Sequence, residues 1–209
     1  MQKILIMSLV YLLTFTDSIS AKESVKSDVS WVPIITEDLI TFVSGNTSTA
    51  SLDTKTKKVY LDTINAVRAE SQDCGVYGVK PAVPALQWND LLYKAALEHS
   101  NDLAKTDTFS HDGSGNSTDI TAEKTQLGRG SKVGERIEYN GYTNWRAYGE
   151  NIAAGTSMDE AQEAIDVWVE SDGHCKNLMN PNFTEVGMAK VYDADSHYSH
   201  YWTQDFGKR

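Results

Sequence analysis

The segment Trp168–Gly187, WVESDGHCKNLMNPNFTEVG, marks the point where a predicted helix gives way to a predicted sheet. Ahead of it, Ser157 and Glu160 form a capping-box pattern, and the helix that they begin is expected to end at Gly173. The buried face of this helix is expected to consist of the apolar residues at helical spacing, namely Ala161, Ala164, Ile165 and Trp168. Behind it, the runs EVGMAKVYD and HYWTQDFG alternate in polarity around a short polar segment, which predicts a β-hairpin.

Two more helices and one more strand are predicted upstream of this segment. Apolar residues recur at helical spacing over residues 58–71, and Asn89 is a suitable N-cap for a helix over residues 90–105. Residues 150–155, ENIAAG, predict a third strand, whereas residues 74–88 contain two prolines and predict a loop. These elements predict an α+β fold, with a small central antiparallel sheet flanked by helices on both sides.

The first 56 residues differ in composition from the remainder. Residues 1–21 combine a lysine, a short apolar run and small polar residues, which is typical of a secretory signal peptide. An uncleaved membrane anchor is the alternative. Residues 22–56 are rich in Ser, Thr, Lys and Asp and predict a flexible tether. The compact domain is therefore expected over residues 57–209, outside the cytoplasm: secreted, extracellular or periplasmic.

The overall charge limits the class of partner. The chain carries a net charge of −10 and shows no basic stripe, so a nucleic-acid partner is not expected. Contact with a membrane is expected only through the signal segment.

The chain has two cysteines, Cys74 and Cys175. In an oxidising compartment a single pair is expected to form a disulfide. On the chain-entropy model, closing a loop of this length is worth roughly 4–5 kcal/mol. The competing interpretation makes Cys175 a nucleophile beside His174.

Six motifs, in fixed order, carry a resemblance to a known family. They are FSHDGSG (109–115), GERIEYNGY (134–142), GENIAAG (149–155), WVESDGHCKN (168–177), NPNFTEVGMA (180–189) and YWTQDFG (201–207). This set resembles the CAP superfamily of cysteine-rich secretory, antigen 5 and pathogenesis-related class 1 proteins, over nearly the whole predicted domain. The free-standing domain and its GHxxN motif are similar to those of the bacterial secreted members. The resemblance implies a three-layer α-β-α sandwich with a cleft.

The resemblance also implies which residues line that cleft. Many family members place two histidines and two acidic residues there, and the matching positions here are His111, Glu150, Glu170 and His174. Glu170 departs from the pattern of several eukaryotic members, in which the acid lies one position later, where this chain has Ser171.

The same four residues suggest two kinds of site. Imidazoles and carboxylates can hold zinc or another divalent cation, with His111 and His174 as ligands. The alternative is a polar cleft without metal, in which Glu150 orients His174. No other cofactor is predicted.

Other chemically capable residues are assigned structural roles. His99 lies on the apolar face of its predicted helix and is expected in the core, whereas His197 and His200 are expected to face solvent. Arg136 is expected to clamp loop carbonyls. The segment around Ser114 lacks the Gly-x-Ser-x-Gly spacing of a nucleophile elbow, so serine catalysis is not predicted.

Two functions of different classes remain. The first is an extracellular binding module, without catalytic activity, whose ligand is a lipid, a peptide, a cell-wall glycan or a divalent cation. The second is a metal-dependent hydrolase that uses the same cleft, with Glu150 as the base. A passive wall-associated protein is a third possibility, and fold resemblance alone does not decide among the three.

Overall fold

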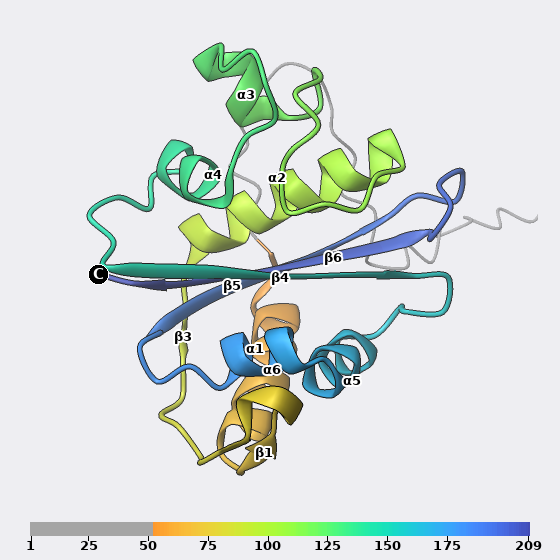
Figure 1. Ribbon diagram of the computed structural model, residues 1–209. Coiled ribbons are helices and arrows are strands. Elements are labelled where there is room, and N and C mark those ends of the chain that lie inside the picture. The colour runs from red at the N-terminus through yellow and green to blue at the C-terminus, as the bar shows by residue number, and fades with distance from the viewer. Residues whose placement is uncertain (1–51) are drawn as a thin grey trace, which may run out of the picture. The chain divides into compact units, whose positions relative to one another are not determined.

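The computed structural model describes residues 52–209 (Figure 1). The predicted signal segment, and the predicted tether up to residue 51, lie outside the described residues. Helix α1, Thr54–Arg68, begins after Asp53, whose side chain accepts hydrogen bonds from the backbone N–H groups of Lys55 and Thr56. The last three residues of the predicted tether are therefore helical.

A four-stranded sheet forms the middle layer. Its strands are β3 (Gln87–Trp88), β4 (Ala147–Gly155), β5 (Glu185–Tyr192) and β6 (His200–Lys208), in the order β3-β5-β6-β4. The three long strands are antiparallel, as predicted, but the two-residue β3 pairs with β5 in parallel. The sheet is therefore mixed. The sequence does not reveal β3, because two residues in a proline-containing segment are too short to show a period.

Helices cover both faces of the sheet (Figure 1). On one face lie α1, α5 (Ala161–Glu170) and α6 (Asp172–Leu178), and on the other lie α2 (Asp90–Thr106), α3 (Ile120–Thr125) and α4 (Val133–Tyr139). The predicted three-layer α-β-α sandwich is thus confirmed. None of the helices in residues 52–209 has the length and apolar character needed to cross a membrane.

Strand β6 is the centre of the core. It lies between β5 and β4, and its residues from His200 to Gly207 are all buried. Trp202 and Phe206 pack with Trp168 in the layer of α1 and α5, while Tyr201 packs with Leu103 of α2 on the opposite face. The prediction that His200 faces solvent is wrong, because this residue begins the central strand.

Helix α5, which precedes the GHxxN motif, begins and ends at other residues than the sequence predicts. It begins at Ala161, after Glu160, whose backbone N–H donates to the Glu163 carboxylate at 2.8 Å. It ends at Glu170, because Ser171 adopts an extended conformation with φ −98° and ψ 118°. Residues 172–178 then form α6. His174 consequently lies on a short helix instead of in a loop.

The predicted disulfide is confirmed. Cys74 and Cys175 are bonded, with their Cα atoms 5.4 Å apart, so neither thiol is free to act as a nucleophile. Cys74 connects β1 (Gln72–Asp73) to the short 3-10 helix η1 (Gly75–Tyr77), which is followed by β2 (Val79–Lys80). The bond therefore attaches this hairpin to α6, the helix that carries His174.

Candidate functional site

The Glu150 carboxylate is the centre of a buried polar cluster above β4. The side chain is 1% exposed, and its two oxygens bind different partners. Oε1 lies 2.7 Å from Nδ1 of His111, and Oε2 accepts a 2.7 Å hydrogen bond from Nη2 of Arg136. The cluster therefore joins β4, α4 and the loop after α2.

Arg136 has the clamping role predicted for it, together with an ion pair that the sequence does not reveal. Its guanidinium donates to the backbone carbonyls of Ser131 and His111, both at 2.9 Å. The same group neutralises Glu150 in a site where neither side chain is more than 1% exposed. Burial alone would raise the pKa of Glu150, but the charge of Arg136 and the hydrogen bonds with His111 and Arg136 lower it. The carboxylate is therefore ionised at neutral pH.

His99 is fully buried on α2, as predicted, but it also belongs to this cluster. Its Nε2 atom is 2.9 Å from the Ser110 carbonyl, so this nitrogen carries the proton and donates it. The same atom is 3.8 Å from Glu150 Oε1, while Nδ1 has no hydrogen-bond partner among the described residues. Burial lowers the pKa of His99, which keeps the ring neutral.

Asp205 is a second buried carboxyl group that sequence reasoning missed. It lies on β6 directly opposite Glu150, and within the described residues neither of its oxygens has a hydrogen-bond partner. Burial, and then the negative charge of Glu150, raise its pKa well above the usual value. Asp205 is therefore protonated where Glu150 is ionised. The only sequence signal is an acidic residue inside an otherwise apolar strand.

The two histidines predicted for the cleft have pKa values shifted in opposite directions. His111 is half-exposed, and its hydrogen bond with Glu150 raises its pKa. His174 is partly buried, and burial followed by the charge of His111 lowers its pKa. The charge of His111 thus reaches His174, while the convergence of the two rings in one cleft stays a prediction. The Nδ1 atom of His174 has no partner among the described residues.

His174 approaches from the opposite helical layer. Its backbone carbonyl accepts a bond from Asn151 Nδ2 at 3.3 Å, and Asn177 on the same helix donates to the carbonyl of Glu150 at 3.2 Å. These amides attach α6 to β4. Glu150 itself contacts His111 instead of His174, so the predicted orienting bond has a different partner.

Glu170 lies at the last position of α5 and is exposed. Within residues 52–209 its side chain makes no hydrogen bond or ion pair. Its participation in the cleft stays a prediction.

Two buried carboxylates hold the loop that carries His111. Asp102 accepts bonds from the backbone N–H and hydroxyl of Ser114 and from the Thr118 hydroxyl, at 2.6–2.7 Å. Asp119 accepts from the backbone N–H groups of Gly115 and Ser131 and caps α3. The sequence gives no direct signal for either role, because most of these backbone N–H and hydroxyl partners lie 12 or 16 residues away along the chain.

The donor set fits a metal ion only in part. Outward-facing nitrogens of His111 and His174 would be the ligands, and a carboxylate on the other nitrogen of a ligating histidine is a common arrangement. However, both oxygens of Glu150 are already engaged, and two imidazoles fill only half of a tetrahedral zinc shell. Within the part of the chain that the structure describes, no group of three or more His, Cys, Asp or Glu residues is arranged to hold a metal.

Comparison with protein families gives a match over most of the chain. The model of the cysteine-rich secretory protein family, CAP, matches residues 61–206. That range includes every residue of the polar cluster described above.

Three similar proteins come from Bacillus species. A protein named "Uncharacterized protein YkwD" of Bacillus subtilis is 30% identical over 62% of this chain and 40% of its own length. A second, named "Uncharacterized membrane protein YlbC", is 27% identical over 76% of this chain and 36% of its own length. The crystal structure of an extracellular protein with an SCP domain from Bacillus anthracis superposes with a TM-score of 0.51 at 25% identity, covering 77% of this chain and 45% of that one. The chain therefore spans less than half the length of these relatives.

Proposed function

Because the chain belongs to the cysteine-rich secretory protein family, we propose that it is an exported binding module that holds a ligand between His111 and His174. The observation that carries the proposal is the bond between His111 and a buried, ionised Glu150. Glu150 fixes the orientation of the ring and leaves the opposite nitrogen, Nε2, free for a ligand: it accepts a hydrogen bond when the ring is neutral and donates one when the ring is protonated. Such a nitrogen suits recognition of the hydroxyl or amide groups of a ligand.

Binding is favoured over catalysis by the state of Glu150. A general base must be free to accept a proton, and it works best with a pKa near the working pH. Glu150 has a lowered pKa, and neither of its oxygens is free to accept a proton from a ligand, since His111 and Arg136 occupy them. This arrangement supports a rigid recognition site.

Export is supported by three observations of different kinds. Residues 1–21 resemble a signal peptide, the Cys74–Cys175 disulfide suits an oxidising compartment, and the similar protein of Bacillus anthracis is named extracellular. The name of the second Bacillus subtilis relative places that protein in a membrane. We propose that this chain acts outside the cytoplasm, and that residues 1–21 direct it there.

The binding proposal is tested by sedimentation with insoluble cell-envelope material from the producing cells. We expect the domain to co-sediment and a His111→Ala, His174→Ala double variant to remain in the supernatant, with its thermal unfolding retained. Tyr139→Ala is the control, because this exposed residue of α4 lines a hollow with Thr125 and Leu127 and not with either imidazole. Equal co-sedimentation of the double variant would contradict the proposal.

Calorimetry with zinc distinguishes the rival function, a metal-dependent hydrolase, from the binding module. If His111 and His174 are ligands, zinc must displace the proton that Glu150 helps His111 to hold, so binding should strengthen as pH rises. The double variant should then lose the heat of binding. No heat with the wild-type domain at millimolar zinc would eliminate the metal-dependent reaction.

A further inference from the structure

We propose that two pairs of aromatic side chains, on either side of His111, bind a linear, uncharged, β-linked glycan. The pairs are Phe109 with Tyr198 and Trp145 with Tyr148. This inference rests on the proposed function, because it names the class of ligand held at the same site.

The first pair adjoins the His111 loop. Phe109 is 50% exposed and precedes His111 by two residues, and Tyr198, which is 38% exposed, comes from the β5–β6 hairpin. Their ring centroids lie 6.2 Å apart. Tyr201 supports this pair, because its ring contacts Tyr198 edge-on and its hydroxyl donates a 2.8 Å hydrogen bond to Asp107.

The second pair lies at the other end of β4. Trp145 and Tyr148 pack edge to face with centroids 4.5 Å apart, and the indole N–H donates to Glu138 at 2.9 Å. Tyr148 is 40% exposed. It lies two residues before Glu150, and residues two apart on a strand share a face, so Tyr148 lies on the same side of the sheet as the polar cluster.

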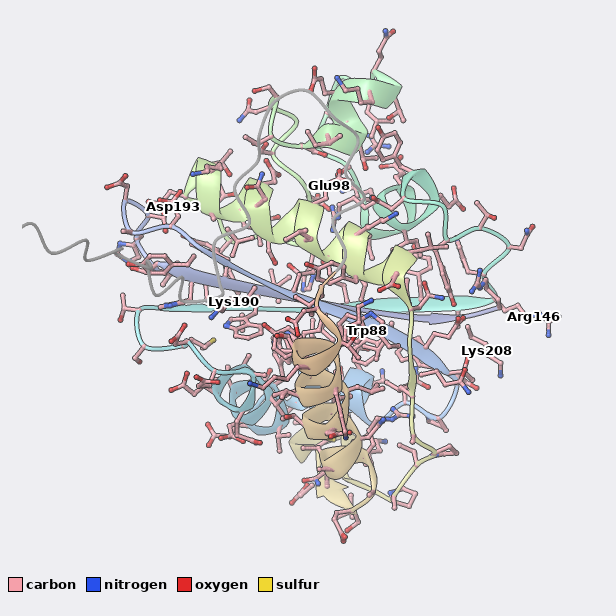
Figure 2. All side chains as sticks on the ribbon, turned by 180° about the vertical axis from the view of Figure 1, so that it is seen from behind. Trp88, Glu98, Arg146, Lys190, Asp193 and Lys208 are labelled. Atoms are coloured by element: carbon pink, nitrogen blue, oxygen red, sulfur yellow. A yellow bond between two sulfur atoms is a disulfide. The ribbon has the colours of Figure 1, made fainter. Side chains whose placement is uncertain are left out.

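The register of the sheet arranges these groups in a row. Ala154 of β4 pairs with Tyr201, which supports Tyr198, and Glu150 lies between Ala154 and Tyr148 on the same face. The six residue steps along β4 from Tyr148 to Ala154 span about 20 Å. In Figure 2 the two ends of the sheet are marked by Arg146 with Lys208 and by Asp193. The row therefore places an aromatic pair toward each end and the His111 imidazole between them.

The chemistry of the row matches a sugar chain. A sugar ring in a β-linked chain presents a flat face of C–H bonds, which packs on an aromatic face, and hydroxyl groups around its rim, which form hydrogen bonds with an imidazole nitrogen. Exposed tyrosine and tryptophan combine a broad apolar surface with a polar tip in the same way. The net charge of −10 repels anionic polysaccharides, which favours an uncharged glycan.

A peptide bound as an added strand fits less well. β4 is the edge strand of the sheet, where strand addition would take place. However, the carbonyls of Glu150 and Ile152 already accept bonds from Asn177 Nδ2 at 3.2 Å and Trp168 Nε1 at 2.9 Å. An added strand would compete with these bonds, as expected for an edge protected against pairing.

The test is a titration of the folded protein with cellohexaose and chitohexaose, followed by calorimetry and by the ring resonances of His111. We expect binding of at least one of them, and none of maltohexaose, whose α-linked chain coils. Phe109→Ala and Tyr148→Ala should each weaken binding about threefold to tenfold, from the size of an aromatic contact. Tyr139→Ala, a tyrosine of similar exposure (43%) outside the row, should leave binding unchanged.

The failure of this inference is distinguishable from failure of the proposed function. If neither β-linked probe binds at millimolar concentration, or if Tyr139→Ala weakens binding as much as Tyr148→Ala, the glycan row is wrong. If envelope binding requires His111 and His174 but is insensitive to both aromatic variants, the proposed function stands and this inference falls. Binding to phosphatidylcholine vesicles in place of the glycans would also overturn it.

Discussion

At the scale of single residues, the cluster around Glu150 depends on one ion pair in a site from which water is excluded, so its charges are screened only weakly. Arg136 and Glu150 are both almost fully buried, and each also binds a second group. Their mutual attraction offsets the cost of removing two charges from water only while both partners are present. The pair is therefore expected to tolerate loss of either member poorly.

Arg136→Ala should lower the free energy of unfolding by about 3–5 kcal/mol, because it leaves the Glu150 carboxylate buried without its counter-charge. Urea unfolding followed by circular dichroism measures this change. Arg129→Ala is the control, since Arg129 forms a similar pair with Glu135 at the exposed surface, where screening leaves little net energy. A similar loss in both variants would contradict the argument.

Asp205 gives the molecule a pH dependence of its own. Its pKa is raised in the folded state, so between the unfolded pKa and the folded pKa the folded protein binds one proton more than the unfolded chain. Stability from this group therefore falls as pH rises through that window. Glu150 has the opposite sign: its lowered pKa contributes stability that is present at neutral pH and is lost as the pH falls from 4.5, the unfolded value, to about 2.

Asp205→Asn should remove the loss of stability that arises because Asp205 must take up a proton when the chain folds. Between about pH 4, the unfolded pKa, and the raised folded pKa, the wild type should lose roughly 1.4 kcal/mol of unfolding free energy per pH unit through this residue. The variant should not show this loss. Urea unfolding at a series of pH values measures the two slopes. Asp195→Asn, a substitution in the β5–β6 hairpin, should keep the wild-type slope, and an unchanged slope in Asp205→Asn would refute the assignment.

At the scale of elements, the site depends on short connections as much as on helices and strands. The loop between α2 and α3 carries His111 and is held by the carboxylates of Asp102 and Asp119. On the other face, α6 carries His174 and is held by the Cys74–Cys175 bond and by amide contacts with β4. Each histidine is thus positioned by a segment with its own covalent or hydrogen-bonded anchor.

Loss of the disulfide should affect both stability and the site. A Cys74→Ser, Cys175→Ser variant should lose roughly 4–5 kcal/mol of unfolding free energy on the chain-entropy model, because the bond closes a loop of about 100 residues. Its His174 ring resonance should shift more than that of His111, since only α6 is attached directly. Thiol titration of the unreduced, denatured wild type should find no free thiol, and a stable variant with an unmoved His174 would contradict this view.

At the scale of the whole molecule, the described residues form a complete sandwich around β6. Helix α1 contributes Tyr60 and Ile64 to the largest core cluster, and Leu52 packs against that cluster before the helix begins. Residues 52–56, which the composition of the chain assigns to the tether, therefore include a core contact, the cap and the first turn of α1.

A chain of residues 51–209 should consequently unfold at a higher temperature than a chain of residues 57–209. The shorter chain lacks the Asp53 cap, the first turn of α1 and the contact of Leu52 with the core. Differential scanning calorimetry compares the two. Equal melting temperatures would show that the first turn of α1 contributes nothing to the core.

The sequence alone determined the features that depend on local pattern and on motif order. Periodicity located the three long helices and three long strands, and the motifs around His111, Glu150 and His174 indicated the family and hence the layers. The cysteine pair followed from the compartment. Short elements such as β3, α3, α4 and α6 were missed, because fewer than eight residues do not show a clear period.

Only the tertiary structure decided which groups meet and in what charge state. The contact of Glu150 with His111 instead of His174, the participation of His99, and the pairing of Asp205 with Glu150 all join residues from different elements. Their pKa shifts depend on burial and on distances between groups that are far apart in the chain. The physical reason is that local sequence sets the backbone conformation, whereas electrostatic energy depends on neighbours that folding brings together.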